Sequence, residues 1–296
     1  MKRFLLIVGC ILCFSAQAQK RNLKVISYNI WNGFDFGKDV ERHDKTIDWL
    51  ISKAPDVIAL QELCGYTQEK LLEDAKKWGH NYAVILKESC HSVGLTSSQP
   101  ILLKEKVIDE LWHGMLHCET FGIDFFVVHL SPIDYDFRMK ETAIIRSVVA
   151  DISSDSYMVL GDFNAQSPFD GDRDLNYPEA LSNKRLSDEQ NQKYNTLADE
   201  EFDYSVMSSF LSFPLIDIAQ KFVPSEHRFT VPAKARRGSG RSDIEIENDR
   251  RRIDFIMTSR KLALQCVNAS IFNGEDTSLL SDHYPIMAEF HMDEEP

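Results

Sequence analysis

The stretch that decides the fold is MVLGDFN, residues 158–164. Its apolar first half, together with Ser156 and Tyr157, predicts a β-strand over residues 156–161. The strand ends in Asp162 and Asn164, two side chains that a protein core disfavours, because burying an unpaired carboxylate is costly. The stretch therefore predicts a strand that delivers polar groups to a functional site.

The same arrangement of apolar strand residues beside a polar group occurs at five other places in the chain. Asn29 follows VISY, Glu62 follows VIALQ, His129 follows FFVV, Asp254 interrupts IDFI, and Asp282-His283 precedes YPI. A divalent cation that several of these carboxylates share would compensate their charges together. The sequence thus predicts that these groups converge on one pocket.

Apolar periodicity between these points predicts an α/β protein. Strands are expected at 23–30, 56–61, 81–88, 123–130, 156–161, 252–258, 266–272 and 284–290, and helices at 39–54, 67–79, 136–152 and, as a pair, 204–221. The first helix is expected to bury Val40, Ile47, Leu50 and Ile51 on one face. Residues 167–201 are polar and irregular, which predicts a surface excursion beside the site.

The N-terminus resembles a targeting segment. Lys2 and Arg3 precede an apolar stretch from Phe4 to Phe14, and Ala16-Gln17-Ala18 has the pattern of a cleavage site. We expect a signal peptide over residues 1–18 and a single catalytic domain over 19–296, exported (periplasmic or secreted) and without a transmembrane segment. A lipoprotein box ending at Cys10 is the alternative.

The net charge of the chain limits the kinds of partner that it is expected to bind. The net charge is −13, and removal of residues 1–18 makes it −15, because Lys2 and Arg3 are lost. A strongly acidic protein has no broad electrostatic attraction to a nucleic-acid backbone, so nucleic acid is possible as a partner but not favoured.

After removal of residues 1–18, four cysteines remain, Cys64, Cys90, Cys118 and Cys266. They allow three pairings, among which the sequence does not choose, and they lack the spacing of a zinc site.

The chain resembles the endonuclease/exonuclease/phosphatase superfamily, which includes deoxyribonuclease I, exonuclease III, neutral sphingomyelinases and inositol-polyphosphate 5-phosphatases. Six short motifs carry the resemblance, in the family's order: SYNI (27–30), LQE (60–62), VHL (128–130), GDFN (161–164), RIDFI (252–256) and SDH (281–283). Each is weak alone, but together they span the mature chain. The resemblance implies a four-layer α/β sandwich, with two packed mixed β-sheets flanked by helices. We expect the protein to be a monomer.

The resemblance also implies roles that suit the chemistry of these residues. Glu62 is expected to be the main ligand of Mg²⁺, for which Mn²⁺ or Ca²⁺ could substitute, with Asn29 and Asp282 nearby. Asp162 would orient or deprotonate the attacking water, and Asn164 would fix that water or a phosphate oxygen. Asp254 would hold His283 in one tautomer, and His129 would donate a hydrogen bond to a non-bridging phosphate oxygen.

Other polar groups are interpreted more plainly. Arg236 and Arg237, in the basic loop 234–241, are expected to bind substrate, with a solvated loop as the alternative. Trp31 is expected to pack rather than to line the site. The remaining histidines are expected to be structural or surface groups: His43, His80, His91, His113, His117 and His227.

The sequence therefore predicts an exported Mg²⁺-dependent hydrolase of phosphoric esters that acts by in-line attack of water. A phosphodiesterase or phosphatase acting on a small phosphoester, a headgroup or a lipid is the first hypothesis. A secreted DNase or RNase with the same active site is the second. A non-catalytic binding protein on the same fold is a third, of another class, because a fold does not by itself establish a function.

Overall fold

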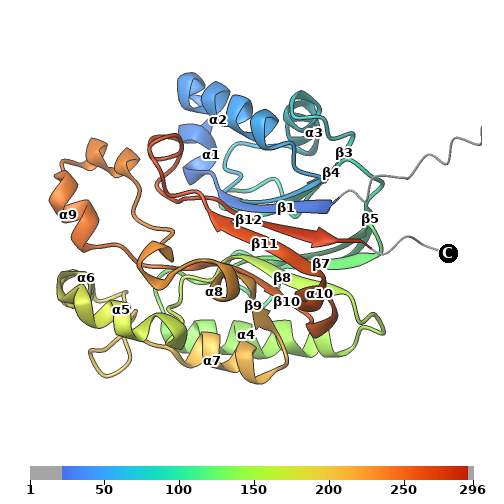
Figure 1. Ribbon diagram of the computed structural model, residues 1–296. Coiled ribbons are helices and arrows are strands. Elements are labelled where there is room, and N and C mark those ends of the chain that lie inside the picture. Colours follow the sequence, from blue (N-terminus) through green and yellow to red (C-terminus); the bar gives the residue numbers. More distant parts are fainter. Residues whose placement is uncertain (1–21, 293–296) are drawn as a thin grey trace, which may run out of the picture.

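Two six-stranded β-sheets pack face to face in the computed structural model, which describes residues 22–292 (Figure 1). The predicted signal peptide lies outside the described residues. The first sheet has the order β11-β12-β1-β2-β4-β3 and the second β5-β6-β7-β8-β10-β9. Helices cover the outer face of each sheet, so the predicted four-layer sandwich is confirmed.

The first sheet is built around two parallel strands, β1 (Asn22–Asn29) and β2 (Val57–Gln61). Antiparallel neighbours extend it on both sides. They are β12 (Ile286–His291), β11 (Cys266–Ile271), β4 (Gly94–Ser97) and β3 (Tyr82–Ile85). The central pair is buried on both faces along most of its length, which agrees with the apolar run VIAL in β2 and with the apolar residues Leu23, Val25 and Ile26 of β1.

The second sheet repeats this plan around the parallel strands β7 (Ile123–His129) and β8 (Tyr157–Asp162). The antiparallel strands are β6 (Met115–Thr120), β5 (Leu102–Val107), β10 (Asp254–Thr258) and β9 (Ile216–Asp217). Gly161 pairs with Val128, and a Cβ at Gly161 would come within 2.0 Å of the Val128 carbonyl oxygen. The glycine of GDFN therefore permits the close approach that brings Asp162 beside His129.

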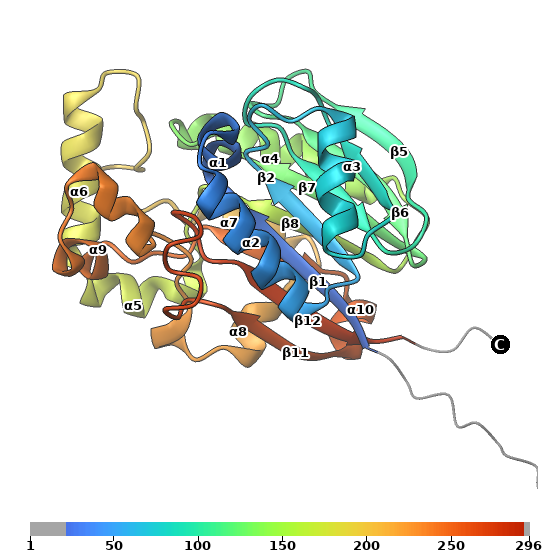
Figure 2. The same ribbon diagram turned by 90° about the horizontal axis from the view of Figure 1, so that it is seen from above.

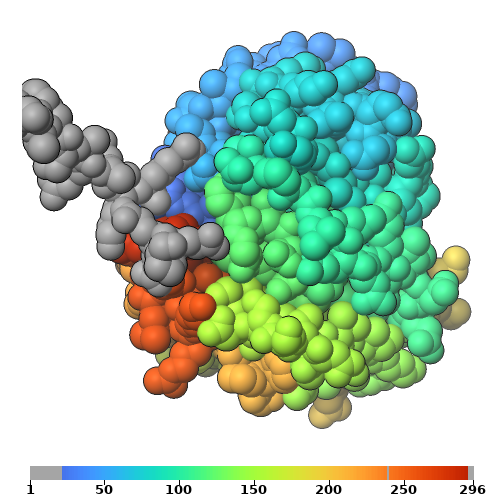
Figure 3. Space-filling model, turned by 90° about the vertical axis from the view of Figure 1, so that its right-hand side faces the viewer, coloured from blue at the N-terminus to red at the C-terminus, as the bar shows by residue number. Residues whose placement is uncertain are grey.

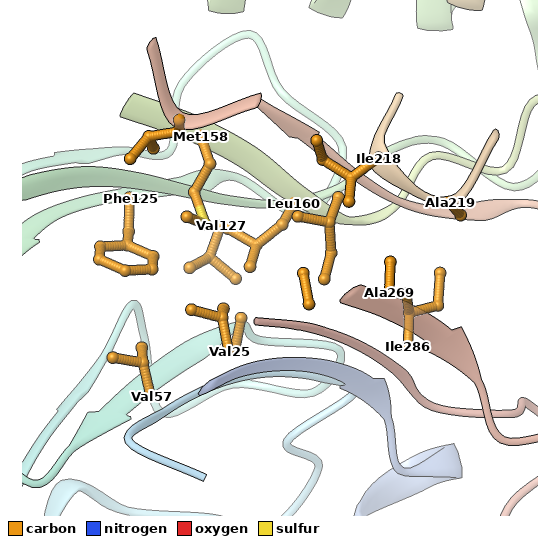
Figure 4. Packing of buried hydrophobic residues seen from close by; sticks show 14 of the residues in the cluster. Val25, Val57, Phe125, Val127, Met158, Leu160, Ile218, Ala219, Ala269 and Ile286 are labelled. Carbon is orange, nitrogen blue, oxygen red and sulfur yellow. The ribbon is translucent and has the colours of Figure 1, made fainter. Parts of the chain in front are cut away.

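Three apolar layers hold the sandwich together. Figure 4 shows the layer between the sheets, where Val25 and Val57 from one sheet face Val127 and Leu160 from the other. A second layer joins the first sheet to α2 (Val40–Lys53) and α3 (Gln68–Lys77). A third joins the second sheet to α4 (Tyr135–Ala150) and α7 (Ser205–Ser212). Three further helices are short: α1 (Trp31–Gly37), α8 (Ile218–Phe222) and α10 (Arg260–Gln265).

The structure corrects the predicted burial of α2. Ile47 and Leu50 are buried, but Val40 and Ile51 are 60% and 49% exposed. Arg42 occupies the buried side instead, where its guanidinium donates to the carbonyl oxygens of Ile30 and Trp31 at 2.8 and 3.0 Å. Part of the inner face of α2 is thus polar, because Arg42 provides hydrogen bonds for the backbone carbonyls that follow β1. Apolar periodicity in the sequence does not reveal this role.

The segment 167–201 is not irregular, as the sequence suggested, but largely helical. It contains α5 (Gly171–Asn176) and α6 (Pro178–Gln190). These helices project from the sandwich together with α9 (Asp243–Asn248), on the side where β1 and β2 end (Figures 1 and 2). The predicted basic loop is also partly helical, with a 3₁₀ segment at Lys234–Ser239 that leads into α9.

Figure 3 shows the opposite end of the molecule, where segments from the first half of the chain lie above segments from the second half. Within residues 22–292 no helix has both the length and the apolar character needed to cross a membrane.

Candidate active site

The predicted site residues meet at one edge of the two sheets. Asn29 ends β1, and Glu62 follows β2, its parallel neighbour. In the other sheet, Asp162 ends β8 and pairs in register with His129 of β7 and with Asp254 of β10. The loop before β12 brings in Asp282 and His283, and the Ser281 hydroxyl fastens this loop by donating to the Asn29 carbonyl at 2.7 Å.

Asn29 connects the two sheets across the pocket. Its side-chain amide donates to Glu62 Oε1 and to Asp162 Oδ2, both at 3.1 Å, and its oxygen accepts the Trp31 N–H at 3.0 Å. The Asn32 N–H donates to Glu62 Oε2 at 2.7 Å. In this arrangement Asn29 acts as a hydrogen-bond donor to the carboxylates, so its predicted place among the metal ligands stays a prediction.

The turn labelled α1, which follows β1, has an unusual backbone. Five of its residues other than glycine have φ between 49° and 58°: Trp31, Asn32, Phe34, Asp35 and Phe36. The left-handed region is costly for such residues. Here it places the Asn32 N–H on Glu62.

His283 and Asp254 form a buried pair. His283 Nδ1 lies 2.9 Å from Asp254 Oδ2, and His283 Nε2 faces Asp162 Oδ2 at 3.8 Å. Burial alone would lower the pKa of His283, but the charges of Asp254, Asp282 and Asp162 outweigh it and raise the pKa well above its usual range. The imidazole is therefore held by Asp254 on one side and presents its other nitrogen to the pocket.

Asp162 lies at the centre of the site. Its Oδ1 accepts the Asn164 N–H at 2.9 Å, and its Oδ2 lies 3.5 Å from His129 Nε2. Burial, and next the charge of Asp254, raise the pKa of Asp162. Burial lowers the pKa of His129 well below its usual value. His129 is thus a neutral imidazole beside Asp162, while the Asn164 amide is turned to the Leu130 carbonyl at 3.0 Å.

The basic segment contributes one of its two predicted residues to this edge. Arg236 Nη1 lies 3.5 Å from Asp282 Oδ2, and its guanidinium lies 5.9 Å from the centroid of the Trp31 ring. Arg237 instead pairs with Asp243 at the start of α9, on the exposed side. The structure therefore brings Arg236 to the site, and the substrate role of Arg237 stays a prediction.

The structure also places in the pocket two histidines that were expected to be structural or surface groups. The pocket that contains Glu62, Asp162 and His283 is also lined by His91, Trp112, His113 and Pro132. The ring centroids of His113 and His129 are 4.2 Å apart. None of these residues follows an apolar strand in the way the six motifs do. The one sequence signal for them is the pair Trp112-His113, which lies just before the apolar residues Met115 and Leu116.

The donor set fits a hard divalent cation. Four carboxylates lie at this edge, those of Glu62, Asp162, Asp254 and Asp282, and oxygen donors of this kind are what Mg²⁺ prefers. Ligand atoms of Asp162, Asp254 and His283 lie within 4.8 Å of one another. Burial raises the pKa values of Asp162 and Asp282, so their charged forms are disfavoured here, and a bound cation would stabilise them.

The fold and this site define a class of protein, the metal-dependent phosphoric ester hydrolases. Residues 26–283 match the model of the Endonuclease/Exonuclease/phosphatase family, and the chain belongs to that family. No curated protein matches it in sequence.

Solved structures share the fold. An AP endonuclease from Archaeoglobus fulgidus superposes with a TM-score of 0.67 at 18% identity, covering 91% of this chain and 100% of that one. The 3′ phosphatase NExo from Neisseria, bound to a product DNA hairpin, gives a TM-score of 0.63 at 18% identity, with the same coverage. D. rerio TDP2, complexed with a single-strand DNA product, gives 0.61 at 17% identity, covering 92% of this chain and 99% of that one. At these identities the likeness establishes a common fold.

Proposed function

We propose that the protein is an exported, Mg²⁺-dependent hydrolase that acts on the phosphoester of a small molecule, a headgroup or a lipid. The observation that supports this proposal is a pocket lined by Glu62, Asp162 and His283, with the carboxylates of Asp254 and Asp282 beside His283. Export and a single catalytic domain over residues 19–296 are part of the proposal, and they rest on the sequence pattern of residues 1–18.

The residues divide the chemistry among them. Glu62 and Asp282 would hold the cation, with Asn29 nearby. When bound, the cation would offset charge on the phosphate oxygens. Asp162 orients the attacking water and accepts its proton, a task for which a raised carboxyl pKa is suited. Asn164, beside Asp162, helps to fix the water or a phosphate oxygen.

The two histidines would contact the phosphoryl group in different ways. His283 is cationic because of the surrounding carboxylates and so can stabilise negative charge on phosphate. His129 is neutral and can donate one hydrogen bond from Nε2 to a non-bridging oxygen. Water attacks phosphorus in line, the bond to the leaving oxygen breaks, and no covalent enzyme intermediate forms.

The proposal is tested by EDTA-sensitive hydrolysis of bis-p-nitrophenyl phosphate in the presence of Mg²⁺, Mn²⁺ or Ca²⁺. Glu62→Gln should lower the rate at least about 100-fold. Glu73→Gln, at an exposed acid on α3, is the matched control and should leave the rate unchanged. Absence of hydrolysis with every one of the three metals would favour a non-catalytic binding protein instead.

A secreted nuclease is the second candidate, because two of the structural neighbours are described with DNA products. The net charge of −13 opposes it. A panel of single-stranded and double-stranded DNA, RNA, sphingomyelin, inositol phosphates and nucleotides separates the two candidates. A preference for the nucleic acids by more than about tenfold in kcat/KM would select the nuclease.

A further inference from the structure

Part of the pocket lining has no role in the proposed mechanism. The pocket has a volume of about 260 Å³, more room than a phosphoryl group alone requires. Besides the residues already given chemical roles, it is lined by His91, Trp112, His113 and Pro132. We call His91, Trp112 and His113 the ring wall. All three present flat rings, and none carries a carboxylate.

The rings of the wall form a continuous series that begins at the phosphoryl site. His113 lies 4.2 Å from His129 between ring centroids, with the planes 31° apart. His91 lies 5.1 Å from His113, and Trp112 lies 6.3 Å from His113 at nearly a right angle. A group attached to a phosphate held at His129 would therefore meet these rings next.

The wall is held in place by contacts from neighbouring segments. The carboxylate of Glu141 accepts the Trp112 N–H on one oxygen and the Ser131 N–H on the other, both at 2.8 Å. The His91 N–H donates to Cys64 Sγ at 3.1 Å, within the Cys64–Cys90 disulfide. Trp112 itself remains 42% exposed. A fixed backbone with an exposed tryptophan at a pocket mouth is an arrangement suited to stacking.

The wall offers little to an anion. Burial, and next the imidazole of His129, lower the pKa of His113 to about 2, so this ring is uncharged at neutral pH. Trp112 is neutral as well. Lys87, whose charge lowers the pKa of His113 further, does not belong to the lining of the pocket. A second phosphate placed here would find hydrogen-bond partners, but neither Trp112 nor His113 would offer it a positive charge.

We propose that the ring wall is a subsite for an uncharged ring in the alcohol that is esterified to the scissile phosphate. The inference rests on the proposed hydrolase function and narrows its substrate class. Trp112 stacks on the ring, and the imidazoles of His91 and His113 hydrogen-bond to its hydroxyl or carbonyl groups. The shared chemistry is a neutral six-membered or five-membered ring, which a sugar, a cyclitol, a nucleoside or an aryl group could supply.

The test compares non-hydrolysable ligands that differ only in the ring. Methylphosphonate and phenylphosphonate are titrated by calorimetry into the full mature chain with Ca²⁺. We expect phenylphosphonate to bind at least about tenfold more tightly, a ratio in the range that one stacked ring supplies. Trp112→Ala should reduce the ratio to below about two, and Trp112→Phe should retain most of it. Tyr82→Ala, which removes a ring of similar exposure (40%) on β3, is the matched control and should leave the ratio unchanged.

Further ligands identify the source of the ring and test its charge. Inositol 1-phosphate, thymidine 5′-monophosphate and phenylphosphonate distinguish a cyclitol, a nucleoside and an aryl group. Benzene-1,4-diphosphonate adds a second anion to the same ring and should bind no more tightly than phenylphosphonate. Tighter binding of the diphosphonate that depends on Trp112 would overturn the proposal, as would equal affinity of the wild-type chain for methylphosphonate and phenylphosphonate.

The two proposals can fail separately, because methylphosphonate and phenylphosphonate have no ester bond to hydrolyse and so report binding alone. A chain that hydrolyses bis-p-nitrophenyl phosphate but shows no preference for the ring retains the hydrolase function and loses the subsite. A chain that binds phenylphosphonate through Trp112 but hydrolyses nothing with any of the three metals retains the subsite and loses the hydrolase function.

Discussion

Two of the proposed site residues, Glu62 and Asn164, have left-handed backbones, with φ of 61° and 48°. This conformation costs roughly 1–2 kcal/mol for a residue with a Cβ, so the surrounding contacts must hold it. Glu62 is held by Asn29 and Asn32, and Asn164 by Asp162 and the Leu130 carbonyl. The backbone strain therefore occurs just after the ends of β2 and β8, where the chain turns and the side chains face the pocket.

Asp254 is expected to act by positioning His283. Replacing it by asparagine removes the charge that most raises the pKa of His283 but keeps the shape of the side chain. We expect Asp254→Asn to lower kcat roughly 100-fold, the scale at which partners of catalytic histidines act, with KM nearly unchanged. The alkaline limb of the pH–rate profile should also move to lower pH, because the protonated imidazole is lost earlier.

Steady-state kinetics from about pH 5 to about pH 10, a range that spans both limbs of such a profile, check this prediction. Asp136→Asn, at an exposed position of α4, serves as the control. An unchanged pH profile with a reduced kcat would mean that Asp254 serves the site in some other way than through the charge of His283.

Asp74 gives a pH dependence of stability that is independent of catalysis. Burial alone would raise its pKa, but hydrogen bonds from His43, Lys77 and Tyr66 lower it to about 2. A carboxyl group with a lowered folded pKa stabilises the protein above its unfolded pKa of 3.8, and this stability is lost as the pH falls toward 2. We expect Asp74→Asn to cost about 1–2 kcal/mol at neutral pH.

Urea unfolding at neutral pH and at successively lower pH measures this cost. The difference from the wild-type chain should shrink as the pH falls from 3.8 to about 2, as Asp74 becomes protonated in both states. The neighbouring Glu73→Gln should show no such convergence, since Glu73 is exposed. A difference that stays constant with pH would show that Asp74 contributes packing rather than charge.

At the level of elements, the central strands and the polar groups at their ends were predictable from sequence for one physical reason, whereas β4, β5, β6 and β9 were not predicted. Strands buried on both faces are continuously apolar, so a polar residue at their end stands out, as Asp162 does after MVLG. The helices of the segment 167–201 were not predictable, because α6 has almost no apolar face. The segment is held by a small apolar cluster of Ala180, Leu197 and Phe202. Buried polar contacts also hold it, such as the Arg138 guanidinium on the Thr196 carbonyl and Arg252 on Asp170.

Contacts between loops that are far apart in the sequence could not be predicted either. His91 and His113 reach the pocket because β3, β4 and β6 bring their loops to it, and no periodicity in the sequence encodes that proximity. The disulfide was one of three possible pairings, and the structure selects Cys64 with Cys90, leaving Cys118 and Cys266 as buried free thiols.

The Cys64–Cys90 disulfide joins the loop after Glu62 to the loop that carries His91. It closes a segment with a sequence separation of 26, which in the chain-entropy description stabilises the fold by about 3.5 kcal/mol. We expect Cys90→Ser, or reduction of the wild-type chain, to lose about this much stability. Activity should fall as well, because Glu62 and the ring wall are then less firmly held.

Urea unfolding and hydrolysis rates with and without dithiothreitol measure both effects. The double variant Cys64→Ser/Cys90→Ser is the control, since the reductant should no longer change it. A wild-type chain whose rate and stability are both unaffected by full reduction would show that the disulfide plays no part in positioning the site.

At the scale of the whole molecule, each of the two sheets contributes carboxylates to the pocket edge, and these carboxylates repel one another. The carboxylates of Glu62 and Asp282 come from the first sheet and those of Asp162 and Asp254 from the second. The apolar layer between the sheets holds them at close range. A cation that binds only the folded chain should therefore stabilise the entire sandwich, and by mass action it adds about 2.7 kcal/mol when its concentration is roughly 100 times its Kd.

We expect saturating Mg²⁺ to raise the Tm by roughly 5–10 °C for a chain of this size, and EDTA to reverse the rise. Asp282→Asn should lose most of this response, because Asp282 is one of the carboxylates proposed to hold the cation, while Glu73→Gln, at an exposed position, should retain it. Calorimetric scans with Mg²⁺, with Na⁺ at equal ionic strength and with EDTA separate specific binding from screening. If Na⁺ produced the same rise as Mg²⁺, the carboxylates would be responding to ionic strength alone, and the pocket would hold no specific cation.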